Sequence, residues 1–506
     1  MIPILTASNG DRLAYMRFFW AICMVASAAE IPAPWKPALD RVTADSLRGH
    51  LSFLASDLLE GRDTPSRGLD IAAEYIAAQF RRAGLEPAGD DGYFQTARRA
   101  VVEPDPVGFE LSMETPSGVI RVAIGQVILQ AAAAGEVAGI EAIRVKLGDT
   151  SALTPEQAGG KVIVAEFPEP DPARRQELFR NFSQLMSAAT KLQAPLVILS
   201  GGGGFPARLL RPTRLIDPAN RPPAGALPPT LVMTDPGAIE ALAAATKITA
   251  HWNAPREKPV TLRNVAGLLR GSDPALKDTA VLVTAHYDHV GVAAGGDGDR
   301  IFNGANDDGS GTVGVIELAG ALASLPARPK RSVVFVTFFG EEKGGLGSRH
   351  YVQNPVIPVE KTVANLNLEQ IGRTDSTDGP QLNNLTITGF DYSNVSEFFI
   401  EAGRSTAIEV YKHEKNSDPY FTRSDNATLA QQGIPAHSIT TAFQYPDYHG
   451  AGDHWDKINY DNMEKVTRAI ALATLLIADS AEEPRWNESN PRAERYFQSW
   501  KKRREK

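Results

Sequence analysis

Acidic and imidazole side chains gather at several points in the second half of the chain, where they could bind metal or move protons. Two of these clusters directly follow apolar runs of strand length, at 279–285 and 332–339, and Glu369 follows a third run at 363–368. Runs of this kind are typical of buried strands. The clusters are His286–His289, Asn303–Gly311, Gly340–Glu342, Glu369 and Tyr448–Asp453.

The spacing within these clusters suits a site for cations. In extended backbone His286 and Asp288 face the same side, so the carboxylate of Asp288 can accept the ring N–H of a metal-binding His286. The adjacent carboxylates of Glu341 and Glu342 repel each other unless a cation or proton lies nearby. Taken singly, each cluster also fits an ordinary loop or a helix cap. Together, at successive strand ends, they fit a pair of divalent ions that share one ligand.

The donor types narrow the choice of metal. The single cysteine, Cys23, excludes a cysteine-rich zinc site and a disulfide framework. Imidazole and carboxylate donors fit Zn²⁺ first, with Mn²⁺ or Co²⁺ as possible substitutes.

The elements that must position these residues alternate along the chain. Apolar positions within 311–325 recur at helical spacing between the first two strand-like runs. Strands buried on both faces and alternating with helices predict a mostly parallel α/β sheet, in which ligands bind beyond the carboxyl ends of the strands. Two amphipathic helices are expected within 44–86, separated by a polar turn at 60–68.

The chain between these two parts has a different character. Residues 101–257 contain short β-like runs, one helical stretch near 173–192 and a Pro-rich loop at 222–229. We therefore expect a β-rich insert there, within a discontinuous domain made of residues 30–100 and 258–480. The polar tail at 481–506 is expected to be a solvated helix or a frayed end.

The composition is that of a globular protein that is not a nucleic-acid binder. The 506 residues include 52 Lys and Arg against 60 Asp and Glu, for a net charge of −8. A nucleic-acid-binding protein would show a basic patch or stripe.

The N-terminal residues predict export. Arg17 is followed by an apolar run at 18–29 that is too short to span a bilayer. We expect a signal peptide at 1–29, cleaved near Ala28 or Ala29, and a periplasmic or extracellular protein with no stable membrane insertion. A short buried helix, or translation from Met16, is the alternative.

The motifs together resemble peptidase family M28, the co-catalytic zinc aminopeptidases and their relatives. The resemblance is carried by Ala285–His289, Asn303–Gly311, Gly340–Ser348, Asn365–Gly372, Arg423–Asp425 and Tyr448–His449, in the family's order. It implies a three-layer αβα sandwich around a mostly parallel mixed sheet. The insert lies where many members carry a protease-associated domain, which it resembles only loosely.

The resemblance also implies roles for individual residues. One Zn²⁺ would be bound by His286 and Glu369 and a second by Glu342 and His449, with Asp307 bridging the two; Asp308 is the competitor for the bridge. Asp288 would orient His286, and Glu341 would be the general base acting on a metal-bridging water. Tyr448 would steady the developing oxyanion, and Arg423 would line the substrate pocket.

Two positions depart from the family pattern. Glu369 stands where Asp is usual, which could alter metal spacing, and Asn426 stands where His usually follows Ser-Asp. We expect the remaining histidines to be non-ligands: His50, His251, His289, His350, His413, His437 and His454.

The implied activity is that of a metallo-aminopeptidase with two Zn²⁺ per chain, acting on the N-termini of peptides or proteins. Alternatives are a carboxypeptidase, a glutaminyl-cyclase-like enzyme and a non-catalytic binding ectodomain. The five-ligand set disfavours a one-zinc cyclase, Arg423 alone is thin support for a carboxypeptidase, and a binding domain needs no general base. The sequence leaves the oligomeric state open.

Overall fold

A computed structural model of the chain describes residues 30–168, 175–201, 213–220, 228–293, 297–375 and 381–505. The signal peptide expected at 1–29 lies outside the described residues. No helix among them is long and apolar enough to cross a bilayer.

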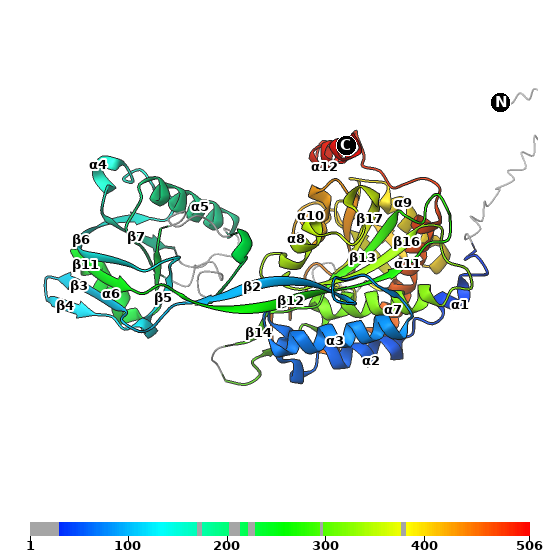
Figure 1. The fold of residues 1–506 in the computed structure, drawn as a ribbon, viewed down its shortest axis with the longest axis horizontal. Helices are drawn as coiled ribbons and strands as arrows, with labels where there is room; N and C mark the ends of the chain where they lie inside the picture. The colour runs from blue at the N-terminus through cyan, green and yellow to red at the C-terminus, as the bar shows by residue number, and fades with distance from the viewer. Residues whose placement is uncertain are drawn as a thin grey trace, which may run out of the picture.

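The larger of the two main sheets is mixed, with a parallel centre (Figure 1). A third, two-stranded sheet pairs β14 (Gly291–Val292) with β15 (Ile301–Phe302). In the larger sheet, neighbouring strands follow the order β19-β18-β20-β17-β13-β16-β12-β2-β9, with β1 also paired to β12. The strands β16, β13, β17 and β20 run parallel to one another, whereas β12 is antiparallel to β16. The bounds are β1 (Glu86–Pro87), β2 (Phe94–Glu103), β9 (Arg214–Ile216), β12 (Arg256–Leu269), β13 (Ala280–His286), β16 (Ser332–Phe338), β17 (Thr362–Leu368), β18 (Asn384–Ile387), β19 (Glu409–Tyr411) and β20 (Ala436–Thr440).

Helices cover both faces of this sheet, because its central strands are apolar on both sides. Val281 and Val283 of β13 join one buried cluster, while Ala280 and Leu282 of the same strand join another. The first face is covered by α1 (Lys36–Leu39), α2 (Ala44–Leu54), α3 (Arg67–Arg82), α7 (Gly311–Ala323), α9 (Val395–Thr406) and α11 (Tyr460–Asp479). The second is covered by α8 (Leu346–Gln353), α10 (Asn426–Gln431) and α12 (Glu494–Arg504). The expected three-layer arrangement is confirmed.

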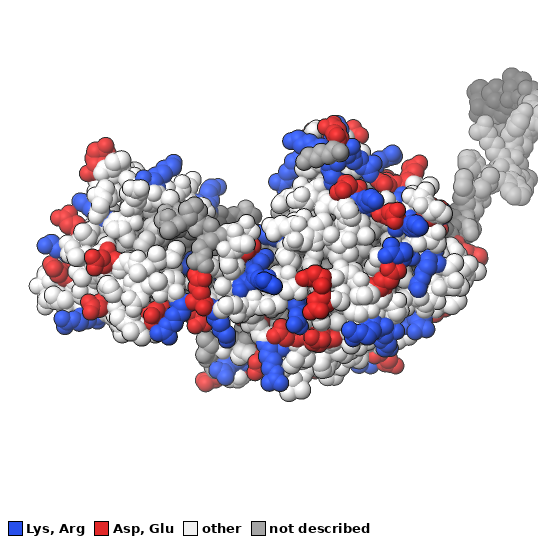
Figure 2. Space-filling view, viewed as in Figure 1, with Lys and Arg blue, Asp and Glu red and all other residues white. Residues whose placement is uncertain are grey.

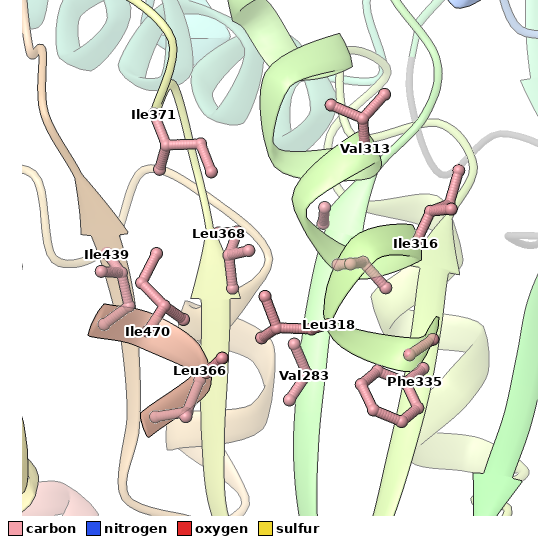
Figure 3. Packing of buried hydrophobic residues seen from close by; sticks show 14 of the residues in the cluster. Val283, Val313, Ile316, Leu318, Phe335, Leu366, Leu368, Ile371, Ile439 and Ile470 are labelled. Carbon is pink, nitrogen blue, oxygen red and sulfur yellow. The ribbon is translucent and has the colours of Figure 1, made fainter. Parts of the chain in front are cut away.

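The helix α7 packs its apolar side chains against the sheet, below the strand ends that carry the candidate site residues. Figure 3 shows Leu318 of α7 directed towards Val283 and Leu366 of the strands, with Ile470 of α11 nearby. Val313 and Ile316 project from other sides of α7, and they belong to the same buried cluster as the strand residues Phe335 and Leu368. These branched and aromatic side chains are 0–3% exposed. Their close packing holds the strand ends in one arrangement.

The second sheet forms a separate lobe within the chain, as expected for a β-rich insert (Figure 1). Its strand order is β4-β3-β11-β6-β7-β8-β10-β5. The strands are β3 (Glu110–Thr115), β4 (Gly118–Arg121), β5 (Val127–Gln130), β6 (Gly135–Lys146), β7 (Val162–Phe167), β8 (Val197–Gly201), β10 (Thr230–Met233) and β11 (Lys247–Trp252), and the helices are α4 (Pro155–Ala158), α5 (Arg175–Lys191) and α6 (Pro236–Ala244).

The two lobes are joined by the long strands β2 and β12, which run side by side between them (Figure 1). Their antiparallel ladder is continuous, from Phe94 paired with Val265 to Glu103 paired with Arg256. The short strand β9, whose residues fall within 101–257, pairs with β2 and so belongs to the larger sheet. On the face drawn in Figure 2, basic and acidic side chains lie interspersed over both lobes.

The C-terminal tail differs from the expected solvated or frayed end. Trp486, Tyr496 and Phe497 are 2–5% exposed and belong to the buried cluster on the second face of the sheet. The rings of Trp486 and Tyr496 stack at 5.2 Å. These aromatic side chains pack the polar tail onto the domain.

Candidate metal centre

Three of the acidic and imidazole clusters meet at one edge of the larger sheet. His286 is the last residue of β13 and pairs in register with Phe338 at the end of β16. Glu341 and Glu342 follow β16 closely, and Glu369 directly follows β17. Because these strands are parallel, their carboxyl ends lie together, and the side chains beyond them face one space.

The turn before α7 brings Asp307 and Asp308 to the same edge of the sheet, where the two carboxylates make different contacts. The buried carboxylate of Asp308 accepts hydrogen bonds from the backbone N–H groups of His286 (3.3 Å), Gly311 (3.0 Å) and Gln370 (3.1 Å). It therefore ties together the ends of β13 and β17 and the start of α7. Asp307, joined to Asp308 by a cis peptide bond, is the acid that lies among the histidines.

All five predicted ligands fall into two groups that share Asp307. In one group, His286 Nε2 is 3.3 Å from Asp307 Oδ1 and 3.5 Å from Glu369 Oε1. In the other, His449 Nε2 is 3.1 Å from Asp307 Oδ2 and 3.0 Å from Glu342 Oε1. The two oxygens of Asp307 thus face different groups, which is the geometry of a bridging carboxylate. Of Asp307 and Asp308, it is Asp307 that lies at the predicted bridge.

These separations fit zinc. With bonds of about 2.0–2.1 Å, two ligands of a tetrahedral zinc lie about 3.3 Å apart. The donor pairs above span 3.0–3.5 Å. The longer side chain of Glu369 reaches His286, so its replacement of the usual Asp keeps the donor in place.

The electrostatics show groups that need a cation or protons between them. Burial would lower the pKa of His449, but the carboxylates of Asp307 and Glu342 raise it to about 10. The pKa of His286 is likewise raised well above its ordinary value by Asp288, Asp307 and Glu369, against the effect of burial. Without metal, protons on the imidazoles therefore offset the negative charge of the acids.

Asp288 connects the predicted ligand His286 with Glu341. Its Oδ1 accepts the backbone N–H of Glu341 at 3.0 Å, and its Oδ2 accepts the hydroxyl of Thr64 at 3.1 Å. His286 Nδ1 lies 3.1 Å from the main-chain oxygen of Asp288 and 3.6 Å from its carboxylate. The ring of His286 thus contacts the main chain of Asp288 more closely than its carboxylate, and the orienting role of that carboxylate stays a prediction. The carboxylate of Asp288 does fix the backbone of Glu341.

Glu341 lies beside both groups and belongs to neither. Burial raises the pKa of its carboxyl well above the ordinary value, and the neighbouring acids Glu342 and Asp425 raise it further. A carboxyl group with a raised pKa is suited to exchange protons near neutral pH. Its role as the general base stays a prediction.

The structure adds positioning residues that the sequence analysis missed near the N-terminus. Arg62 is 1% exposed, and its guanidinium donates to the main-chain oxygens of Tyr287 (2.8 Å), Asn303 (2.7 Å) and Gly304 (2.9 Å). Both Arg62 and Thr64 lie in the polar turn between the first two amphipathic helices. Nothing local in that turn indicates that it packs against residues more than 220 positions away.

Two further positioning contacts were missed near the ligands. Asp453 Oδ2 accepts the backbone N–H groups of Asn306 (3.0 Å) and Asp307 (3.2 Å), which fixes the backbone of the predicted bridging residue. The hydroxyl of Ser424 donates to Glu369 Oε2 at 2.5 Å. The proximity of Asp453 to His449 in the sequence was the available signal for the first.

Asn426, the second departure from the family pattern, is buried, and its side chain makes hydrogen bonds. It donates to the main-chain oxygen of Phe421 (2.9 Å) and accepts from Ser438 (3.0 Å). The contact with Ser438 ties the start of α10 to β20.

Tyr448 and Arg423 lie at the surface. The Tyr448 ring stacks on the predicted ligand His449 at 4.1 Å and is 48% exposed. The guanidinium of Arg423 lies 4.3 Å from the centre of the Tyr420 ring. Their predicted roles, towards an oxyanion and in a substrate pocket, stay predictions.

One residue joins the second group beyond the predicted ligands. His289, which we expected to be a non-ligand, lies with Asp307, Glu342 and His449, and the candidate ligand atoms are all within 4.8 Å of one another. His454, by contrast, is paired with Asp299 at 3.2 Å and belongs to neither group.

Comparisons with known proteins find similar sequences and similar folds. The model of Peptidase family M28 matches residues 264–474. The aminopeptidase YwaD of Bacillus subtilis is 27% identical over 231 residues, which cover 44% of this chain and 47% of YwaD. An aminopeptidase of Pseudomonas aeruginosa is 29% identical over 248 residues, which cover 43% of this chain and 42% of its own. The chain thus spans about half the length of these curated relatives.

Two solved structures share the fold across both lobes. The aminopeptidase from Aneurinibacillus sp. strain AM-1 superposes with a TM-score of 0.56 at 20% identity, covering 89% of this chain and 99% of its own. A zinc aminopeptidase from Bacillus subtilis has a TM-score of 0.53 at 22% identity, with 85% and 94% covered. At these identities the likeness concerns the fold.

Proposed function

We propose that the chain, whose residues 264–474 match the model of Peptidase family M28, is a zinc-dependent aminopeptidase that carries two Zn²⁺ ions. The observation that carries the proposal is the shared carboxylate of Asp307, whose two oxygens face two separate groups of imidazole and carboxylate donors. Relatives named as aminopeptidases support the choice of reaction.

The residues around the two donor groups would have separate roles in peptide hydrolysis. Two zinc ions, when bound, would polarise the scissile carbonyl and lower the pKa of the attacking water towards neutral pH. Glu341 accepts the proton of that water and returns it to the leaving amine, a role worth about 10²–10⁴-fold in rate. Asp288 holds the backbone of Glu341 in place, so the base keeps its distance from the ligands.

Preference for a free N-terminus follows from charge. The carboxyl groups of Glu341 and of Glu369, itself one of the donors, lie at the edge of the sheet where the other donors meet. Carboxylates held near a site favour an ammonium group over a neutral amide, because the opposite charges attract. We propose that they receive the N-terminal ammonium of the substrate.

A panel of peptide substrates tests the proposal. Free aminoacyl peptides and their N-acetylated counterparts, identical in every other residue, would be incubated with the full chain before and after zinc removal by a chelator. We expect cleavage of the free peptides only, one residue at a time, lost with the chelator and restored by zinc. Equal cleavage of acetylated peptides, or activity indifferent to metal, would exclude a zinc aminopeptidase.

We also propose that the chain is exported, on the strength of the apolar run at 18–29 and the absence of cysteine after Cys23. The N-terminal sequence of the protein isolated from a secreting host tests this. A mature chain that starts just after Ala28 or Ala29 is expected, and a cytoplasmic protein that retains the apolar run would contradict it.

A further inference from the structure

We propose that His289 is a metal ligand, so that one of the two sites has four protein donors and the other has three and an open position. This inference rests on the proposed function for the presence of zinc. It concerns a residue outside the five-ligand set that the family resemblance implies.

The first observation is that His289 is buried without a hydrogen-bond partner. The residue is 0% exposed, and neither ring nitrogen makes a hydrogen bond within the described part of the chain. A buried polar group left unpaired costs about 1–3 kcal/mol. The buried His437 shows the usual solution, because its two nitrogens lie 2.7 Å from the oxygen of Thr388 and 2.6 Å from the hydroxyl of Ser393.

The second observation is where the unpaired nitrogens lie. His289 Nδ1 is 3.0 Å from Glu342 Oε1, the same oxygen that lies 3.0 Å from His449 Nε2. This approach is close but is not aligned as a hydrogen bond. Two donors that direct their lone pairs at a common cation produce this relation, and a spacing near 3 Å fits the edge of a zinc tetrahedron, about 3.3 Å.

The ring is also held in this place. The backbone N–H of His289 donates to the main-chain oxygen of Arg62 at 3.2 Å. Gly304 adopts a left-handed conformation with φ of 59°, and a Cβ there would lie 2.5 Å from Cγ of His289. The imidazole therefore fills the space that a side chain at 304 would need, which keeps it against Glu342.

The two sites would differ in function because one has four protein donors and the other has three. A zinc with four protein ligands is typical of a structural site, whereas catalytic zinc keeps three protein ligands and an open position. The group of His289, Asp307, Glu342 and His449 would therefore bind the first and tighter zinc. The three-ligand group of His286, Asp307 and Glu369 would bind the second and offer the open position, close to Asp288 and Glu341.

X-ray absorption of the unmutated protein gives the decisive measurement, because it counts imidazoles per zinc. If His289 is a ligand, the protein loaded with one zinc shows two imidazoles per zinc, and with two zincs the mean is three imidazoles over two ions. If it is not, the count is one imidazole per zinc in both states. A mean of one imidazole per zinc in the protein loaded with two zincs would overturn the inference while leaving the proposed function intact.

A variant provides the second measurement. In His289→Gln the affinity for the tighter zinc, measured by competition with a chromophoric chelator, should fall by about 100-fold or more. Loss of a residue that only hydrogen-bonds to a metal ligand already lowers metal affinity by about 10–100-fold. His454→Gln is the matched control and should leave both affinities unchanged. An unchanged tight affinity in a folded His289→Gln protein would contradict the inference. If the unmutated protein binds no zinc, the proposed function fails together with the inference.

Discussion

Glu341 can be separated from the metal ligands by a single substitution. Glu341→Gln keeps the size of the side chain and removes its basicity, and Glu341 belongs to neither donor group. We expect kcat to fall by about 10²–10⁴-fold with the zinc content unchanged. Steady-state kinetics and metal analysis measure the two effects, with Glu360→Gln on the surface as the control. A variant that retains its rate would show that another group takes the proton.

His437 should make the stability of the larger lobe depend on pH. Burial lowers the pKa of His437 to about 4, from 6.5 in an unfolded chain. Between these values the unfolded chain binds more protons, so stability is full above pH 6.5 and falls as the pH drops towards 4. The loss attributable to this residue is about 3 kcal/mol.

Urea unfolding at several pH values tests this expectation. His437→Gln should be less stable at neutral pH but should lose less stability on acidification than the unmutated protein. His251→Gln, at an exposed position, should follow the unmutated protein. Identical pH slopes for His437→Gln and the unmutated chain would contradict the assignment.

At the scale of elements, α7 offers a matched pair of glycines. A Cβ at Gly311 would lie 2.4 Å from both Asp308 Oδ1 and the main-chain oxygen of Leu368, whereas a Cβ at Gly320 meets nothing within 4 Å. Gly320→Ala should stabilise the protein by up to about 1 kcal/mol through helix propensity. Gly311→Ala should destabilise it and weaken zinc binding, because Asp308 ties α7 to the ends of β13 and β17. Thermal unfolding and zinc titration measure the stability and the zinc affinity of both variants. Equal effects of Gly311→Ala and Gly320→Ala would show that Asp308 does not hold the start of α7 closely against the strand ends.

Sequence periodicity predicted these elements well because their signals are local. The runs at 279–285, 332–339 and 363–368 correspond to β13, β16 and β17, and the helix expected at 311–325 is α7 at Gly311–Ala323. The parallel sheet and the edge at which the ligands meet followed from that alternation.

What the sequence could not provide depends on contacts between distant positions. Arg62 acts through carbonyl groups that follow it by more than 220 residues, and no local pattern marks an arginine for burial. Whether His289 has a hydrogen-bond partner is likewise a property of the packed structure. The tail at 481–506 was misjudged because its three buried aromatic side chains are scattered among polar residues.

At the scale of the whole molecule, the two lobes have separate cores. Buried clusters of the insert contain only residues between 111 and 252, and none of these belongs to the clusters that pack the larger sheet. The site lies entirely in the larger lobe. We therefore expect two thermal transitions, of which only one moves upwards when zinc is added, since a ligand stabilises the unit that binds it.

Calorimetry with zinc and with a chelator measures this difference. Leu231→Ala, in the core of the insert, should lower the zinc-independent transition and leave the other in place, because a buried Leu→Ala change costs about 2–5 kcal/mol in its own unit. A single transition that shifts as a whole with zinc would show that the lobes unfold together.

The ladder between β2 and β12 means that the chain leaves the larger lobe and returns to it through neighbouring positions. Glu103 and Arg256 are cross-strand partners. A two-residue Asn-Gly turn could join them into a hairpin, as it joins antiparallel strands elsewhere. The intervening 152 residues, 104 to 255, could then be removed or exchanged as a cassette, at the cost of β9. Evolution could thus have gained, lost or replaced the insert without moving a ligand.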